Sequence, residues 1–183
     1  SFPDISCPAY IRNAPKDEWS ATHHPSSTFR RLRDRGEVGT ESARERFVRW
    51  RLEELLIKHP GLRLVSGPSG WVRLAGVLAF TAEAPAREQI ADEYHIEIDV
   101  PESFPEQLPS VKEPQGRIPA DFHKLEGGAL CLGSPTRLLL IARESVSLPR
   151  FVDRCVVPYL YGHSYFERYR TMPFGELEHG AAG

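Results

Sequence analysis

The stretch EYHIEIDVP, from Glu93 to Pro101, decides the fold class, because apolar and polar residues alternate along it. Successive side chains of a β-strand point to opposite faces, so the two sets separate onto two faces of one strand. The apolar face carries Tyr94, Ile96, Ile98 and Val100, and the polar face carries His95, Glu97 and Asp99. This pattern predicts a half-buried antiparallel strand whose polar face, His95 included, points to solvent.

Two further β-rich runs lie before this strand, GLRLVSG from Gly61 and WVRLAGVLAFTAE from Trp71, with Gly, Pro and Ser turns between the runs. A short fourth strand is predicted at about 110–112. It follows the segment FPEQLPS, whose two prolines exclude regular ladder pairing. The strands are consecutive in the chain, so they predict a meander sheet.

A helix is predicted before the sheet. Ser42 and Glu45 have the S-x-x-E spacing of a capping box, in which each side chain satisfies a free backbone amide of the first turn. Apolar residues then recur at helical spacing: Val48, Leu52, Leu55 and Leu56. The sequence HPG at 59–61 ends the helix. Its other face carries Arg44, Arg46, Arg49 and Arg51, which are either a solvated face or a docking face for an acidic partner.

The chain after Pro114 is predicted to be a long irregular region, QGRIPADFHKLEGGALCLGSP, and irregular regions of this length tend to be functional. A helix capped by Ser147 follows, with Pro149 in its first turn. Its buried stripe is Leu148, Phe151, Val152, Cys155 and Val156. We interpret Cys155 as a core residue and expect Pro158 to end or kink the helix. Strands between a first and a last helix indicate an α+β fold, a sheet backed by helices.

The chain of 183 residues suits one domain with an appendage. We expect residues 1–40, rich in Pro, Ser and charge, to be an arm that packs loosely or orders on a partner. Residues 41–183 would then form the domain, including an aromatic-rich C-terminal tail. The ending PFGELEHG suggests no mechanism.

Composition argues against several classes of protein. With 23 basic and 25 acidic residues, the formal net charge is −2, which disfavours binding to nucleic acid or anionic membranes. No apolar run approaches the roughly 18 to 20 residues of a membrane span, and the first residues lack a signal-peptide pattern. Three widely spaced cysteines, Cys7, Cys131 and Cys155, fit a reducing cytoplasm without a disulfide framework. His23 and His24 near Cys7 lack a fourth ligand, so we expect no metal and no cofactor.

The segment HKLEGGALCLGSP, from His123 to Pro135, places Cys131 between glycines in a turn-rich region. Acyl transfer by a thiol needs an accessible thiolate and donors for the developing oxyanion. His123 is the nearby side chain that fits a base or an oxyanion donor, and glycines at 127 and 128 would let backbone amides approach the reacting carbonyl. The residues alone leave a catalytic Cys131 and a core-edge Cys131 equally open.

The order of these features resembles the ubiquitin-conjugating enzyme family over roughly residues 40–160. Its proline-bearing segment after the sheet is matched by Phe104-Pro105, Leu108-Pro109 and Val111. Its "G.iCL" cysteine motif is matched by Gly128, Leu130, Cys131 and Leu132. The resemblance implies the α+β fold of that family, with an N-terminal helix, a four-stranded meander, an irregular active-site segment and C-terminal helices.

The chain departs from the family at two places. The family's HPN tripeptide is missing, and His123 stands at the position of its Asn, eight residues before Cys131. The family's Trp-Pro pair after the cysteine is missing too. Both departures resemble the divergent bacterial branch found in antiphage defence operons, some of whose members work beside an activating enzyme and a ubiquitin-like protein.

The resemblance implies a catalytic pair, Cys131 and His123. A ubiquitin-like protein, activated elsewhere, would be carried as a thioester on Cys131 and transferred to an amine of a target protein, with His123 stabilising the oxyanion. The arginine face of the first helix would meet the activating enzyme. Two alternatives stay open: a non-catalytic binding module of the ubiquitin-conjugating-like or RWD type, and a cysteine hydrolase, for which Glu126 lies too close in sequence to orient His123.

Overall fold

The computed structural model describes residues 42–173, and these form an α+β fold around one four-stranded sheet. The strands are β1 (Leu62–Val65), β2 (Trp71–Ala82), β3 (Ile90–Pro101) and β4 (Ser110–Lys112). All three pairings are antiparallel and the spatial order is β1-β2-β3-β4, so the predicted meander is confirmed. The predicted arm, the residues Cys7, His23 and His24, and the ending from residue 174 onward lie outside the described residues.

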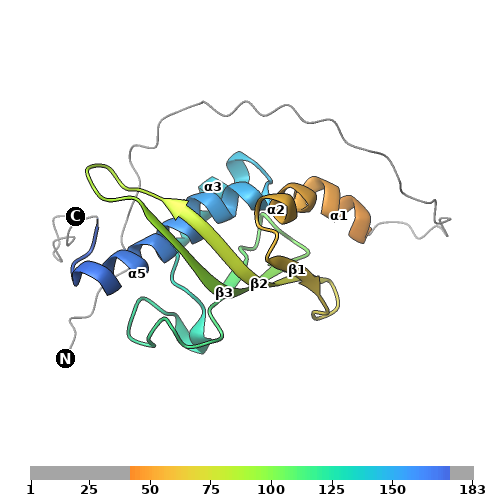
Figure 1. Cartoon of the computed structure of the whole chain (residues 1–183). Helices are drawn as coiled ribbons and strands as arrows, with labels where there is room; N and C mark the ends of the chain where they lie inside the picture. The colour runs from red at the N-terminus through yellow and green to blue at the C-terminus, as the bar shows by residue number, and fades with distance from the viewer. Residues whose placement is uncertain (1–41, 174–183) are drawn as a thin grey trace.

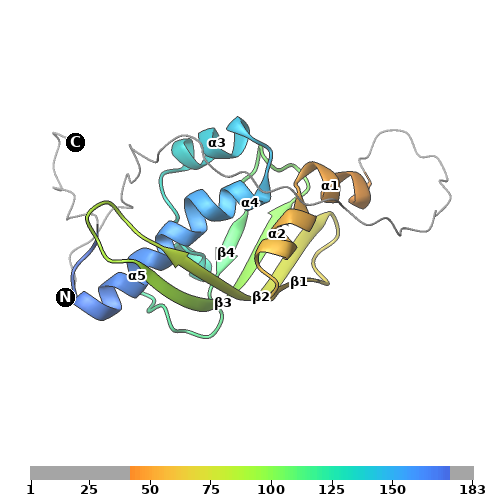
Figure 2. The same cartoon turned by 45° about the horizontal axis from the view of Figure 1, so that its top comes forward.

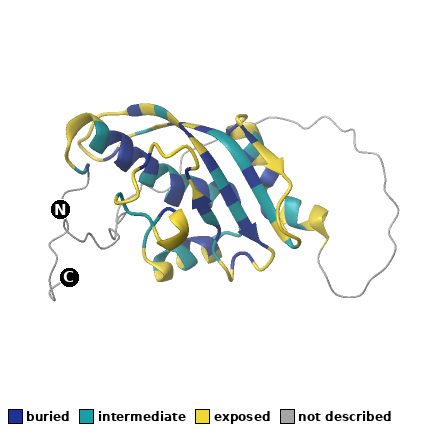
Figure 3. Ribbon diagram, turned by 90° about the horizontal axis from the view of Figure 1, so that it is seen from below, coloured by how far each residue is buried: buried dark blue, intermediate teal, exposed yellow. Residues whose placement is uncertain are grey.

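The predicted two faces of β3 are confirmed. Its four apolar residues are buried, and His95 is exposed. Strand β2 pairs with β3 along its whole length, from Trp71 opposite Pro101 to Ala82 opposite Ile90. Figure 3 shows the resulting alternation of buried and exposed residues along the strands.

The predicted N-terminal helix is broken into two, α1 (Ala43–Arg49) and α2 (Leu52–Lys58). The capping box of Ser42 and Glu45 is present. The break lies at Trp50 and Arg51, where Arg51 has φ 55.

This break corrects the predicted apolar stripe. Val48 is 70% exposed, whereas Trp50 is fully buried and meets Phe104 edge to face, with ring centroids 5.8 Å apart. In a single straight helix, the directions of the Val48 and Trp50 side chains would be fixed relative to each other. The left-handed backbone of Arg51 interrupts the helix and lets Trp50 enter the core. Leu52 and Leu55, on α2, are buried as predicted.

The break also divides the predicted arginine face. Arg46 forms an ion pair with Glu102, and its side chain is only 12% exposed. Arg51, at the break, pairs with Glu54 at 2.5 Å. Arg44 and Arg49 remain exposed on α1, where the Arg49 guanidinium lies 5.7 Å from the Trp50 ring centroid.

The C-terminal third is more helical than the sequence analysis predicts. Helix α3 (Pro135–Glu144), which the sequence analysis missed, is followed by α4 (Leu148–Phe151), a π-turn (Val152–Val156) and α5 (Val157–Tyr169). The predicted cap is confirmed, because the Ser147 side chain accepts from the Arg150 amide. Pro158 does not end the helix: the wide π-turn just before it accommodates a residue without an amide proton.

Helices α4 and α5 lie across the inner face of the sheet, with α2 beside them and α1 extending from one end (Figures 1 and 2). Phe151 of α4, Val156 of the π-turn and Leu160 of α5 are among the buried residues that complete the core with the apolar face of β3. None of the helices in the described part of the chain has the length and apolar character that a membrane span requires.

Candidate active site

His123 and Cys131 lie opposite each other on the two arms of a narrow hairpin. The Cys131 amide donates to the His123 carbonyl oxygen at 2.8 Å, and Lys124 bridges Leu130 in antiparallel register. The arms are joined by the short 3₁₀ turn η1 (Glu126–Gly128). His123 and Cys131 are eight residues apart in sequence, but their backbones are in contact. The fold therefore brings the two predicted site residues together.

The glycines of this turn let its backbone close tightly. Gly127 and Gly128 have φ 82 and φ 80, in the left-handed region that glycine adopts without strain. The Gly128 amide donates to the Leu125 carbonyl oxygen at 3.0 Å. That amide closes the turn. The expectation that backbone amides at the two glycines approach a reacting carbonyl stays a prediction.

His123 is half-buried, and its backbone also has a positive φ of 41. Its ring meets the Phe122 ring edge to face, with centroids 5.4 Å apart. Burial lowers the pKa of the imidazole, so His123 is neutral at neutral pH. A neutral imidazole keeps one N–H donor, which is the group that oxyanion stabilisation requires.

The hairpin borders a cavity of about 60 Å³ whose lining is mostly apolar. The lining includes His123 and Cys131 from the hairpin, Leu138 from α3, Cys155 from the π-turn and Tyr159 from α5. Helix α3, unforeseen from the sequence, therefore supplies one wall of the candidate site. An apolar wall strengthens any hydrogen bond made inside the cavity, since little water competes for it.

The charged groups of the cavity are both basic. Arg137 and Arg154 line it, and Arg154 also donates to Glu144 at 2.7 Å. Positive charge near a cysteine favours the thiolate over the thiol. No residue of the described lining is acidic, and Glu126 is exposed in η1, outside the lining. A carboxylate that orients His123, as a cysteine hydrolase would need, is thus missing among the described lining residues.

Two of the cysteines lie at this cavity in different states. Cys155 is a buried free thiol whose pKa burial raises to about 11, in agreement with its predicted core role. Cys131 is half-buried and is disulfide-bonded. This corrects the prediction of a chain without disulfides, because wide spacing along a sequence does not fix distances in the fold. Cys131 must be reduced before its sulfur can act as a nucleophile.

Sequence reasoning missed Tyr159. Its hydroxyl donates to the carbonyl oxygens of Phe122, at 2.8 Å, and His123, at 3.2 Å. The sequence places Tyr159 four residues after Cys155, so a helix continued through Pro158 would have put both on one face. Because the helix was expected to end or kink at Pro158, this spacing did not predict that Tyr159 lies beside Cys155.

No protein-family model matches the chain, and no curated protein matches it in sequence. The likeness to ubiquitin-conjugating enzymes therefore stays a prediction from short motifs, beside an α+β fold with a four-stranded antiparallel sheet.

Proposed function

We propose that this chain carries a ubiquitin-like protein as a thioester on Cys131 and transfers it to an amine of a target protein. The observation that carries the proposal is the hairpin, which holds Cys131 and a neutral His123 together at one apolar cavity. A place in a bacterial antiviral system is part of the proposal through the resemblance alone.

Two acyl transfers make up the proposed reaction. In the first, the reduced Cys131 thiolate attacks the activated carbonyl carbon at the C-terminus of the modifier. A carbon–sulfur bond forms while the bond from that carbon to its activating group breaks. In the second, a neutral amine attacks the thioester carbon, the Cys131 thiolate leaves, and the amine nitrogen gives up a proton.

The neutral imidazole of His123 serves the second transfer in this proposal. Negative charge develops on the carbonyl oxygen as the amine adds, and an N–H donor in an apolar surrounding stabilises that charge. The apolar wall also lowers the pKa of an incoming lysine by desolvation, which favours the nucleophilic neutral form. Arg44 and Arg49, the exposed arginines of α1, are the proposed contacts with the activating enzyme.

The second candidate is a non-catalytic module of the same fold that binds a protein partner. The disulfide of Cys131 favours it, because a sulfur held in a disulfide cannot form a thioester. The two candidates differ in what the protein does after reduction.

Intact-mass spectrometry separates them. The protein is reduced, freed of thiol reductant, and incubated with candidate ubiquitin-like protein, activating enzyme and ATP. We expect a thiol-sensitive adduct of one modifier mass on wild type and on Cys155→Ala, the matched control from the same cavity, and none on Cys131→Ala. With a partner set that charges another carrier, an uncharged reduced wild type would support the binding module.

A further inference from the structure

The hydroxyl of Tyr159 lies where the hairpin meets α5. It donates to the carbonyl oxygens of both Phe122 and His123. The His123 oxygen accepts in addition the Cys131 amide, at 2.8 Å. One oxygen atom thus joins the tyrosine hydroxyl, the histidine backbone and the cysteine backbone.

His123 needs such support because of its backbone. A φ of 41 is uncommon for residues other than glycine, and surrounding contacts help to hold it. Among the described residues, the imidazole itself accepts or donates no hydrogen bond and contacts the Phe122 ring. The direction of the imidazole is therefore set by the backbone that carries it.

The neighbouring residue is fixed as well. The Phe122 ring meets the Tyr159 ring edge to face at 6.0 Å and the His163 ring at 4.7 Å, measured between centroids. Burial raises the pKa of Tyr159, so its hydroxyl keeps its proton and stays a donor at neutral pH. Helix α5 thus holds this peptide through one hydroxyl and a set of packed rings.

We propose that Tyr159 is a positioning residue of the site, which holds the His123 imidazole beside Cys131 through the carbonyl oxygens of Phe122 and His123. The inference rests on the proposed function and deepens it, because it names the group that fixes the oxyanion donor. Tyr159 acts here through His123 and the hairpin backbone.

The first test is single-turnover discharge of the charged protein to free lysine. Tyr159→Phe removes only the hydroxyl. We expect discharge to slow by about tenfold, the factor that one neutral hydrogen bond is worth, with a smaller effect on charging. In a His123→Ala background the same substitution should change discharge no further, since the donor that it positions is gone.

Tyr161→Phe is the matched control. Tyr161 is a buried tyrosine of the same helix, and its hydroxyl donates to the Glu88 carbonyl oxygen at 2.9 Å, away from the hairpin. Each variant loses one phenolic hydroxyl proton that bonds to backbone oxygen, shared between two carbonyls for Tyr159 and given to one for Tyr161, so we expect losses of stability of similar size. Only Tyr159→Phe should slow discharge, and equal discharge in the two variants would overturn the proposal.

A second test does not depend on any conjugation activity. The His123 ring proton is assigned in the NMR spectrum of the reduced protein by its loss in His123→Ala, and its pKa is then measured in wild type and Tyr159→Phe. A loosened imidazole gains water, so its pKa should rise toward the ordinary value in Tyr159→Phe and not in Tyr161→Phe. An unchanged pKa would contradict the positioning role. A wild type that never charges would refute the proposed function, and this titration would still judge the role of Tyr159.

Discussion

Two histidines lie against the same phenylalanine ring, and they are held in opposite ways. His123 on the hairpin and His163 on α5 both meet Phe122 edge to face. His163 is 2% exposed, and its Nδ1 lies 2.8 Å from the Tyr94 hydroxyl. His123 is half-buried, and its hydrogen bonds run through its backbone carbonyl.

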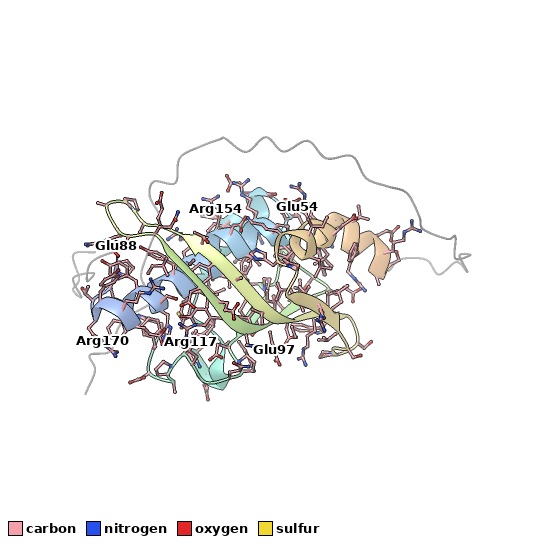
Figure 4. All side chains as sticks on the ribbon, viewed as in Figure 1. Glu54, Glu88, Glu97, Arg117, Arg154 and Arg170 are labelled. Atoms are coloured by element: carbon pink, nitrogen blue, oxygen red, sulfur yellow. The ribbon has the colours of Figure 1, made fainter. Side chains whose placement is uncertain are left out.

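The surroundings of His163 form a polar cluster that is buried at Tyr94 and Ser164 and reaches the surface at Arg117. The Tyr94 hydroxyl lies 2.8 Å from Ser164 Oγ, and Ser164 donates to Asp92 at 2.7 Å. Arg117, labelled in Figure 4 beside the sheet, donates through both terminal nitrogens to Asp92 and lies 4.0 Å from the centroid of the Tyr94 ring. Buried polar groups that are satisfied in this way rigidify a core.

One residue type thus serves two purposes in this fold. The imidazole of His163 is buried and is held through Nδ1 by the Tyr94 hydroxyl, so this histidine stabilises the fold. The hydrogen bonds of His123 are made by its backbone carbonyl oxygen, so its imidazole can contact a group that enters the cavity. Substitutions at the two positions should therefore separate stability from reactivity.

The largest effect is expected at His123. His123→Ala removes the N–H donor and should slow discharge of the Cys131 thioester about 100-fold, while charging persists. His123→Asn should stay within about threefold of wild type, because Asn tolerates a positive φ and offers an amide donor. Quench-flow or gel-based single-turnover rates measure both variants, and an inactive His123→Asn would show that the imidazole does more than donate.

The opposite result is expected at His163. His163→Ala opens a gap in the buried part of this cluster and should lower the free energy of unfolding by about 2 kcal/mol, measured by urea denaturation. Discharge from the charged protein should change by less than about threefold, because the Tyr159 hydroxyl still holds the Phe122 and His123 carbonyl oxygens. If His163→Ala kept the stability of wild type but lost discharge, the assignment of His163 to stability and His123 to reactivity would be contradicted.

Acid should weaken the cluster through Asp92. Burial alone would raise the pKa of Asp92, but hydrogen bonds from Arg117 and Ser164 overcome it and lower the pKa from 3.8 to about 2. A carboxyl with a lowered folded-state pKa contributes stability above its unfolded-state pKa and loses it as pH falls toward the folded-state value. Because Asp92 and Arg117 are partly open to solvent, we expect a contribution of about 1 kcal/mol, lost as pH falls from about 4 to about 2.

Asp92→Asn should lack this part of the pH dependence in denaturation curves taken from pH 6 to pH 2. Asp121→Asn, an exposed aspartate in the irregular segment, is the control and should follow wild type. Parallel curves for wild type and Asp92→Asn would mean that the cluster does not depend on this charge.

The smallest effect is expected in the hairpin turn. Gly128→Ala forces a side chain onto φ 80, where it meets no heavy atom within 4 Å, so strain alone should cost about 1 kcal/mol. Gly128→Asn should cost about half as much, since Asn enters this region more easily. Thermal or urea unfolding compares the two, and equal losses would point to packing instead of backbone strain.

The sheet could be predicted from the sequence because its signal is local. Alternation along residues 93–101 fixes which side chains are buried, and consecutive strands with turn residues between them give the meander. The helices were harder to predict. The burial of Trp50 depends on Phe104, which lies far away in sequence, and this contact outweighs the helical spacing of Val48.

The site was predicted in part for the same reason. His123 and Cys131 were singled out by residue type and by the resemblance, but their contact depends on a turn that closes through Gly127 and Gly128. Tyr159 reaches the hairpin only because α5 continues through Pro158 and crosses the sheet. Neither the path of that helix nor the disulfide of Cys131 is encoded in a short sequence pattern.

The most direct test of the account is the chemistry of the acyl bond at residue 131. Cys131→Ser replaces the sulfur with oxygen, so a charged variant would carry the modifier as an ester. We predict an adduct that resists thiols and is cleaved by hydroxide, with tandem mass spectrometry placing the acyl group on residue 131. A modifier found on any other residue, or an adduct of wild type that resists thiols, would contradict Cys131 as the thioester carrier.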